Sequence, residues 1–257
     1  MWQKELEVGR TAIQAAGDIL SRHLGQVNHI MKKGEIDLVT EADIQAEKAV
    51  LDILRQAYPD DSILSEEAGE RERSSHRTWV IDPLDGTTNF AHAFPFFAVS
   101  IALEVRGKTV LGLVSNPYMN EHFEALAGAG AKLNAKPIRV STTRRVKDAL
   151  IGTGFPYDVH EKPDRVMSLF RKMIVAAQGI RRPGSAAIDL CYVAAGRLDG
   201  FWEQGLKPWD TAAGALIVEE AGGILSTIDG GPYSPYSETI LAGNPYIHEE
   251  MMRILAE

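Results

Sequence analysis

Two aspartates three residues apart, followed by a glycine and two threonines, have the clearest chemical capability in this chain. They close an apolar stretch, in the segment Trp79-Val80-Ile81-Asp82-Pro83-Leu84-Asp85-Gly86-Thr87-Thr88. Carboxylate oxygens are preferred ligands of Mg²⁺, and free backbone N–H groups at a helix start bind phosphate oxygens. The segment therefore predicts a metal site beside a phosphate site.

The spacing of Asp82 and Asp85 needs a change of direction in the backbone. Residues three apart in a continuous strand point to opposite faces. Pro83 fixes its own φ and favours an extended Asp82, so a turn beginning there can bring both carboxylates to one side. Turn or cap roles are the alternative for an aspartate. Further acids upstream, at Glu66, and downstream, at Asp210, favour metal ligation.

Glu66, Glu67 and Asp210 each have an alternative role to metal ligation. Glu66 and Glu67 could form an exposed acidic pair, and Glu67 is the weaker candidate of the two. Asp210 precedes the apolar segment 212–218, where an aspartate can also serve as a helix N-cap. The two roles of Asp210 are compatible. No cysteine or histidine joins the set, and oxygen ligands alone suit Mg²⁺ or Mn²⁺ better than Zn²⁺.

Three ordered motifs resemble the signatures of the inositol monophosphatase family, which are magnesium-dependent, lithium-sensitive sugar-phosphate phosphatases. The motifs are Leu64-Ser65-Glu66-Glu67, Asp82-Pro83-Leu84-Asp85-Gly86-Thr87-Thr88, and Trp209-Asp210-Thr211-Ala212-Ala213-Gly214 followed by Glu220-Ala221-Gly222-Gly223. The resemblance implies two Mg²⁺ ions and a third, weaker one near Glu66, with Mn²⁺ as a possible substitute. The implied ligands are the carboxylates of Glu66, Asp82, Asp85 and Asp210 and the backbone carbonyl of Leu84.

The resemblance also implies catalytic roles. Thr87 is expected to hold the attacking water through its hydroxyl, and Asp43 and Glu66 are expected to assist. Asp43 stands at the third helical position of a capping box that begins at Thr40. Capping alone is therefore an alternative for Asp43.

The implied substrate contacts lie in both halves of the chain. Glu203 could accept hydrogen bonds from ring hydroxyls, although a surface-strand glutamate is the alternative. Arg182 could meet a second anionic group, which would suit a bisphosphate. Lys32 matches a lysine of the family's mobile loop, which is expected to carry the third ion. The substrate-binding set is Asp85, Gly86, Thr87, Gly184, Ser185, Ala186, Glu203 and Arg182.

The implied reaction is hydrolysis of inositol monophosphate or a related small sugar phosphate by metal-activated water attack. Fructose 1,6-bisphosphate and histidinol phosphate are alternative substrates within the family. A haloacid-dehalogenase-type phosphatase would need acids two residues apart, whereas Asp82 and Asp85 are three apart. A non-catalytic relative acting as a protein-binding module is the alternative class. The presence of every ligand position argues against it.

The pattern along the chain predicts a mixed α/β fold. Helices are expected near 3–24, from 41 to Pro59, and near 163–177, 185–196, 210–221 and 246–256. Strands are expected near 98–105, 109–114, 121–127, 149–153, 199–203, 224–228 and 239–242. The resemblance implies a layered α-β-α-β-α sandwich, like that of inositol monophosphatase and fructose-1,6-bisphosphatase. We expect one domain over 1–257, made of two packed lobes of about 1–140 and 141–257 with the active site between them.

The composition of the chain argues against several other classes of protein. The 257 residues carry a net charge of −8 and one cysteine, Cys191. This excludes an intrachain disulfide and disfavours nucleic-acid binding, which usually needs a basic face. No stretch approaches the ~20 apolar residues of a membrane helix. We expect a cytoplasmic enzyme, and the family resemblance implies a homodimer.

Overall fold

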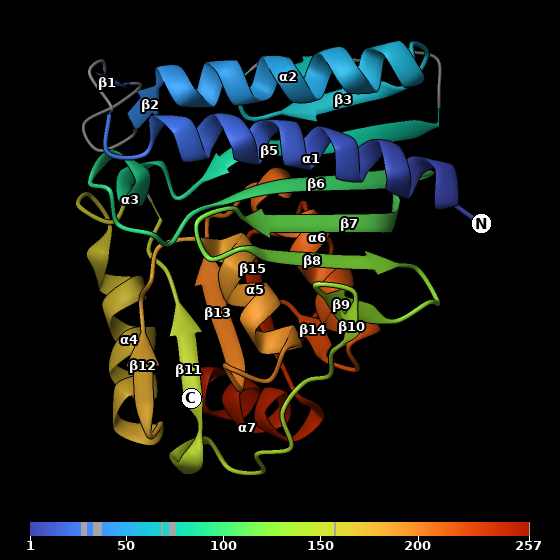
Figure 1. The fold of residues 1–257 in the computed structure, drawn as a ribbon. Helices are drawn as coiled ribbons and strands as arrows, with labels where there is room; N and C mark the ends of the chain where they lie inside the picture. The colour runs from blue at the N-terminus through green and yellow to red at the C-terminus, as the bar shows by residue number, and fades with distance from the viewer. Residues whose placement is uncertain (27–29, 33–37, 68, 72–75, 157, 257) are drawn as a thin grey trace.

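Two long helices cover one face of the molecule. The computed structural model describes residues 1–26, 30–32, 38–67, 69–71, 76–156 and 158–256 (Figure 1). Helices α1 (Gln3–His23) and α2 (Glu41–Ala57) lie side by side over the first sheet. The buried stripe of α1 includes Leu6 and Ile13, seven residues apart as a helical face requires.

The first sheet has eight strands in the order β10-β9-β8-β7-β6-β5-β3-β4. Strands β3 and β5 run parallel, and the other neighbouring pairs are antiparallel. Their bounds are β3 Ser62–Ser65, β4 Gly69–Arg71, β5 Arg77–Asp85, β6 Ala98–Val105, β7 Lys108–Asn116, β8 Glu121–Leu126, β9 Ala131–Leu133 and β10 Lys136–Pro137.

The second sheet has five strands in the order β12-β11-β13-β15-β14. Strand β11 is parallel to both β12 and β13, and β15 is antiparallel to its two neighbours. Their bounds are β11 Leu150–Thr153, β12 Gly179–Arg181, β13 Gly200–Gln204, β14 Ile224–Ser226 and β15 Thr239–Gly243.

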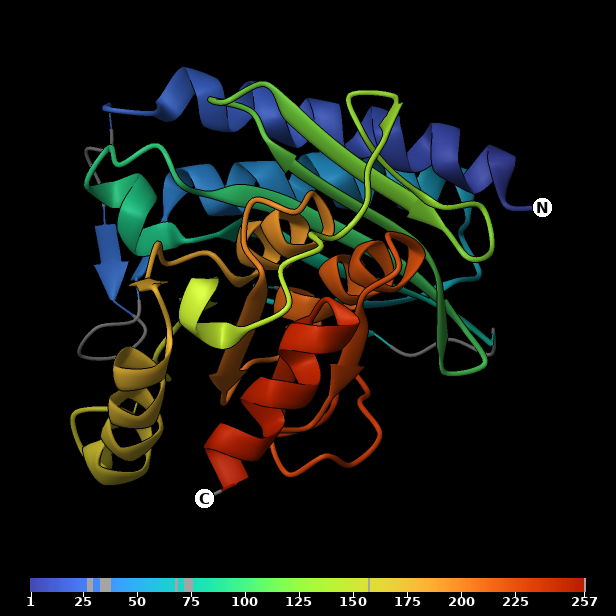
Figure 2. The same cartoon turned by 90° about the horizontal axis from the view of Figure 1, so that it is seen from below.

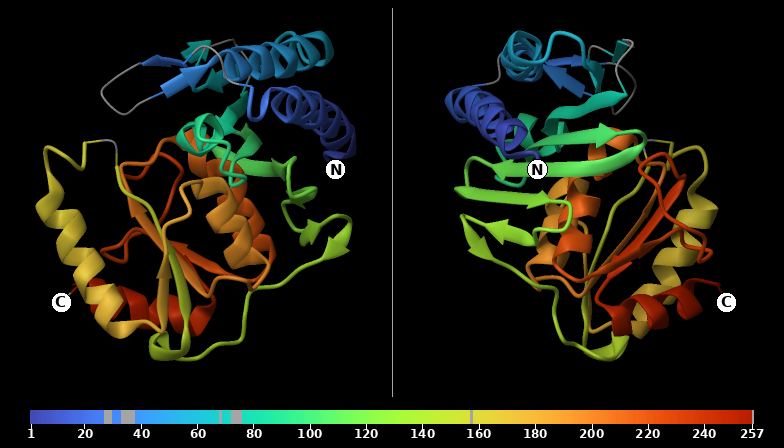
Figure 3. Two further views of the ribbon diagram at one scale, coloured as in Figure 1. Left: turned by 60° about the vertical axis from the view of Figure 1, so that its left-hand side comes forward. Right: turned by 90° about the vertical axis from the view of Figure 1, so that its right-hand side faces the viewer.

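Two helices fill the space between the sheets. Helices α5 (Ala186–Ala194) and α6 (Pro208–Glu220) contact strands of both sheets, and α4 (Pro163–Ala176) and α7 (Pro245–Ala256) cover the outer face of the second sheet (Figures 2 and 3). The layer order is therefore α-β-α-β-α, and the predicted fold is confirmed. The division into two lobes near residue 140 stays a prediction.

Helix α6 lies unusually close to the first sheet. A Cβ atom on Gly112 of β7 would stand 2.6 Å from the carbonyl oxygen of Ala213. Only glycine allows that approach. Residues 211–218 of α6 are all buried, which explains why this middle part of the helix is apolar on nearly every side.

The predicted helices and the seven predicted strands are confirmed, with ends that match or differ by a few residues. Short elements were missed, namely β1 (Ile30–Lys32), β2 (Leu38–Thr40), β3, β4, β9, β10, β12, α3 (Thr87–Ala91) and a 3₁₀ turn at Val146–Asp148. The N-cap reading of Asp210 is wrong: α6 begins at Pro208 with Lys207 as its N-cap. Among the described residues, no helix is long and apolar enough to span a membrane.

Candidate metal and phosphate site

A β-bulge brings Asp82 and Asp85 to the same side of the first sheet. Strand β5 pairs with β6 through Asp82 and Ser100, and again through Asp85 and Ala98. Three steps on β5 therefore oppose two on β6, which is the register of a bulge. The Leu84 N–H donates to Asp82 Oδ1 at 2.9 Å inside this bulge. The predicted change of direction is present, although the strand continues through it.

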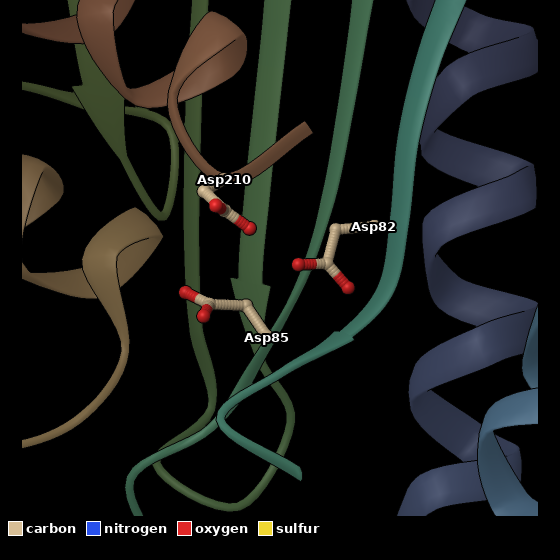
Figure 4. Close-up of side chains that lie close together, drawn as sticks. All are labelled: Asp82, Asp85 and Asp210. Carbon is tan, nitrogen blue, oxygen red and sulfur yellow. The ribbon is translucent and has the colours of Figure 1, made fainter. Parts of the chain in front are cut away.

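Asp210 completes a cluster of three carboxylates. One oxygen from each of Asp82, Asp85 and Asp210 lies within 4.8 Å of the other two. Figure 4 shows the three carboxylates gathered together, with those of Asp82 and Asp210 turned toward each other. Asp210 is the third residue of α6, and its Oδ2 accepts the Lys207 N–H at 2.7 Å. Capping of the helix thus fixes the carboxylate that faces the two aspartates of β5.

The cluster is electrostatically unfavourable without a cation. Burial, reinforced by Glu66 and the other two aspartates, raises the pKa of Asp82 well above its ordinary value. Burial and the charge of Asp85 do the same to the pKa of Asp210. Hard oxygen donors that repel one another at this spacing suit a divalent cation. The residues present therefore fit a metal ion.

Parallel strand pairing places Glu66 next to Asp82. Ser65 of β3 pairs with Ile81 of β5, and the Glu66 N–H donates to the Ile81 carbonyl at 3.2 Å. Glu66 is half-buried and raises the pKa of both Asp82 and Asp210 by its charge. It lies near the cluster without belonging to the compact group of three.

Asp43 divides its two oxygens between a helix cap and Thr87. Oδ2 accepts the Thr40 N–H at 2.8 Å and the Thr40 hydroxyl, so the predicted capping position is confirmed. Oδ1 lies 3.1 Å from Thr87 Oγ1, which is also 3.0 Å from the Leu84 carbonyl oxygen. Burial raises the pKa of Asp43 to about 6. Capping and contact with Thr87 therefore coexist.

The start of α5 holds the carboxylate of Asp85. Ser185, the N-cap of α5, donates its hydroxyl to Asp85 Oδ2 at 2.6 Å, and the Ala187 N–H donates to the same oxygen at 2.8 Å. Burial raises the pKa of Asp85 to about 6, and these hydrogen bonds oppose the rise. Of the predicted residues 184–186, Ser185 and Ala186 thus meet Asp85 from the second half of the chain, and Gly184 lies against Asn89.

Glu203 and Arg182 lie on the side of the site formed by the second sheet. Glu203 is buried in β13, and burial with the charge of Asp210 raises its pKa to about 8, while the nearby Arg182 opposes the rise. The Arg182 guanidinium is exposed and lies over the ring of Phe155, 5.4 Å from its centroid. The two predicted contacts are therefore close to each other and to the acids.

Two polar residues near the site were not predicted. Asp189 of α5 is 1% exposed, and its Oδ1 has no hydrogen-bond partner within the described part of the chain. The sequence signal that could have identified Asp189 as a polar site residue is its position as the one acid in the apolar segment Ala186–Ala194. Asn89 of α3 bonds to three backbone carbonyls, and no sequence signal identified those partners.

The structure says less about the predicted roles of Leu84 and Lys32. The Leu84 carbonyl oxygen lies 3.0 Å from Thr87 Oγ1 as an alternative acceptor to Asp43, and the Leu84 side chain is in the core. Lys32 ends strand β1, and its side chain lies outside the described residues, as do residues 33–37.

The fold and the site define a layered α/β protein with a carboxylate cluster suited to a divalent metal. The profile of the Inositol monophosphatase family matches residues 1–257, and the chain belongs to that family. It is 47% identical to an inositol-1-monophosphatase of Synechocystis over 99% of this chain and 89% of that protein. It is 42% identical to the Nus factor SuhB of Escherichia coli K12, over 96% and 94% of the two chains. The crystal structure of the extragenic suppressor protein SuhB from Bartonella henselae superposes with a TM-score of 0.95 at 43% identity, covering 99% of both chains.

Proposed function

We propose that this protein is a Mg²⁺-dependent phosphomonoesterase that hydrolyses inositol monophosphate or a related small sugar phosphate. The observation that carries the proposal is the convergence of Asp82, Asp85 and Asp210 beside the Gly86–Thr87 turn. The name of the Synechocystis relative supports the substrate class. Fructose 1,6-bisphosphate and histidinol phosphate are the alternative substrates.

The carboxylates of Glu66, Asp82, Asp85 and Asp210, with the Leu84 carbonyl, would hold two or three ions. Bound Mg²⁺ supplies positive charge that neutralises the phosphoryl oxygens and activates water. Each of the three aspartates also accepts a hydrogen bond from the protein, such as that from the Lys207 N–H to Asp210. Such hydrogen bonds keep a ligand in place between turnovers.

Thr87 would orient the attacking water. A hydroxyl has one donor and two acceptor sites, so a Thr87 hydroxyl that donates to Asp43 keeps its lone pairs for a water O–H. Asp43 lies 3.1 Å from Thr87 Oγ1 and has a pKa of about 6, a value suited to taking up a proton near neutral pH. Glu66 would assist from the other side of the water.

The alcohol half of the substrate would face the second half of the chain. Glu203 would accept hydrogen bonds from ring hydroxyls, and Gly184, Ser185 and Ala186 would line the turn toward the phosphate. Arg182 would meet a second anionic group where a substrate carries one. The roles of Lys32, the homodimer, the cytoplasmic location and lithium inhibition stay predictions.

Phosphate release from inositol 1-phosphate, fructose 1,6-bisphosphate and histidinol phosphate, titrated with Mg²⁺ and Mn²⁺, tests the proposal. We expect activity only with metal, and a folded Asp85→Asn variant that loses at least ~10²-fold in kcat. Full activity in EDTA, or in the folded variant, would refute the proposal. A trapped phospho-aspartyl protein would instead support the haloacid-dehalogenase mechanism.

A second candidate is a protein-binding role without turnover. It is supported by the name Nus factor of the Escherichia coli relative. The complete set of acids favours catalysis for this chain. Phosphate release by the wild type with and without Mg²⁺ separates the two candidates, because a protein-binding module without turnover would release none in either condition.

A further inference from the structure

The side chain of Asn89 joins two segments that are distant in the sequence. Its Nδ2 donates to the carbonyl oxygens of Phe96 at 2.7 Å and Pro183 at 2.8 Å, and lies 3.4 Å from that of Gly184. An amide nitrogen has two hydrogens to donate. Three surrounding carbonyl oxygens fix the orientation of the amide, because its own oxygen would be repelled there.

The two segments touch with no room for a side chain between them. A Cβ atom on Gly86 would stand 3.1 Å from the carbonyl oxygen of Gly184, and one on Gly184 would stand 3.1 Å from Asn89 Nδ2. Both glycines have a positive φ, +89° and +96°. Asn89 therefore links the two segments through its side chain at a point where they otherwise meet through backbone atoms.

The segment that Asn89 holds is the same one that holds Asp85. Pro183 and Gly184 lead directly into Ser185, and Ser185 and the Ala187 N–H both donate to Asp85 Oδ2. Asn89 thus holds the beginning of segment 183–187, and Asp85 contacts its end. A shift of this segment would move the hydrogen bonds that orient the carboxylate.

We propose that Asn89 is a positioning residue for Asp85. It fixes segment 183–187 against the loop that carries Gly86 and Thr87, so that the Asp85 carboxylate stays directed at Asp82 and Asp210. The inference rests on the proposed function only for the catalytic consequence. The effect on metal binding follows from the geometry alone.

The test compares Asn89→Ala and the isosteric Asn89→Asp with Thr88→Ala, an exposed neighbour in the same short helix. Mn²⁺ binding by isothermal titration calorimetry, kcat and KM for inositol 1-phosphate, and the melting temperature are measured for each full-length protein. We expect Asn89→Ala to weaken Mn²⁺ binding ~10-fold, in the range for supports of a metal ligand. We also expect kcat to fall with KM little changed. Asn89→Asp should be worse, because its carboxylate would face three carbonyls, and Thr88→Ala should match wild type.

Each outcome decides the proposal. Wild-type Mn²⁺ affinity and kcat in Asn89→Ala, with only a lower melting temperature, would overturn it in favour of a purely structural contact. If Asn89→Ala does not fold, Asn89→Ser, which keeps one donor, decides in the same way. Weakened Mn²⁺ binding in a protein whose wild type releases no phosphate would support the positioning role and refute the proposed function separately.

Discussion

The carboxylate of Glu203 fills the space that a side chain on Gly154 would need. A Cβ atom on Gly154 would lie 2.2 Å from both carboxylate oxygens of Glu203. The φ of Gly154 is not positive, so close approach alone requires glycine here. The backbone just after β11 thus determines where the Glu203 carboxylate of β13 sits.

We expect Gly154→Ala to displace Glu203 and weaken recognition of the polyol. The KM for inositol 1-phosphate should rise ~10-fold, the cost of one or two lost hydrogen bonds. Hydrolysis of p-nitrophenyl phosphate, which has no ring hydroxyls, should change little. Steady-state kinetics on both substrates check this, with Glu203→Gln as the matched control. Equal losses on the two substrates would show that Gly154 has a general structural role instead.

Substitutions of Thr87 can distinguish the contribution of its hydroxyl group from that of its side-chain volume. Thr87→Val keeps the volume and removes the group that contacts Asp43 at 3.1 Å. We expect kcat to fall ~10²-fold, the lower range for loss of a positioned proton-transfer contact. Thr87→Ser should retain most activity, and Mn²⁺ affinity should stay near wild type in both. An active valine variant would exclude the hydroxyl from the reaction.

The metal-free protein should lose stability as the pH rises. Asp85 and Glu203 have ordinary pKa values of 3.8 and 4.5, and in the folded protein these rise to about 6 and about 8, mainly through burial. Between these limits the folded protein binds more protons than the unfolded chain, so the free energy of unfolding falls with rising pH. Urea unfolding in EDTA between pH 4 and 9 measures the slope.

Added Mg²⁺ is the control for this pH dependence. A cation among the acids takes the place of protons, so saturating Mg²⁺ should raise the melting temperature most at the higher pH. Asp82→Asn should reduce that metal effect. A metal-free stability that is flat from pH 4 to 9 would contradict the repulsion inferred for the cluster.

A methyl group at Gly112 should destabilise the contact between α6 and the first sheet. The added Cβ would stand 2.6 Å from the Ala213 backbone oxygen, which cannot swing away as a side chain can. We expect Gly112→Ala to cost about 1–3 kcal/mol of unfolding free energy. Gly179→Ala is the matched control, because its Cβ would meet only the ends of flexible side chains, Leu150 at 3.3 Å and Arg181 at 3.5 Å. Equal stabilities in urea would refute the close contact.

The acids of the site could be predicted because their signal is local. Asp82 and Asp85 stand in a short apolar segment next to Gly86, and that combination has few structural uses. The bulge that turns both to one side could not be predicted, since it depends on the register with β6. The predicted start of α6, at residue 210, is two residues late. Proline is favoured in the first turn of a helix, so Pro208 was a signal for the earlier start, but the prediction did not use it.

The contacts that orient the site depend on chain segments far apart in the sequence. Asn89 bonds to the carbonyl of Pro183, 94 residues away, and backbone carbonyls carry no residue-specific signal. The fit of Glu203 against Gly154 likewise appears only after β11 and β13 are neighbours in a sheet. Sequence patterns name the reactive groups, and tertiary packing determines how they are held.

The packing of α6 against the first sheet limits where the chain can be cut into two stable fragments. Asp210 lies in the C-terminal half of the chain, yet the helix that carries it packs closely against β7 of the N-terminal half at Gly112. A truncated product that stops near residue 140 would leave a broad apolar sheet face bare and would lack this acid. Such a fragment should aggregate, because the apolar face that α6 covers would be exposed to water.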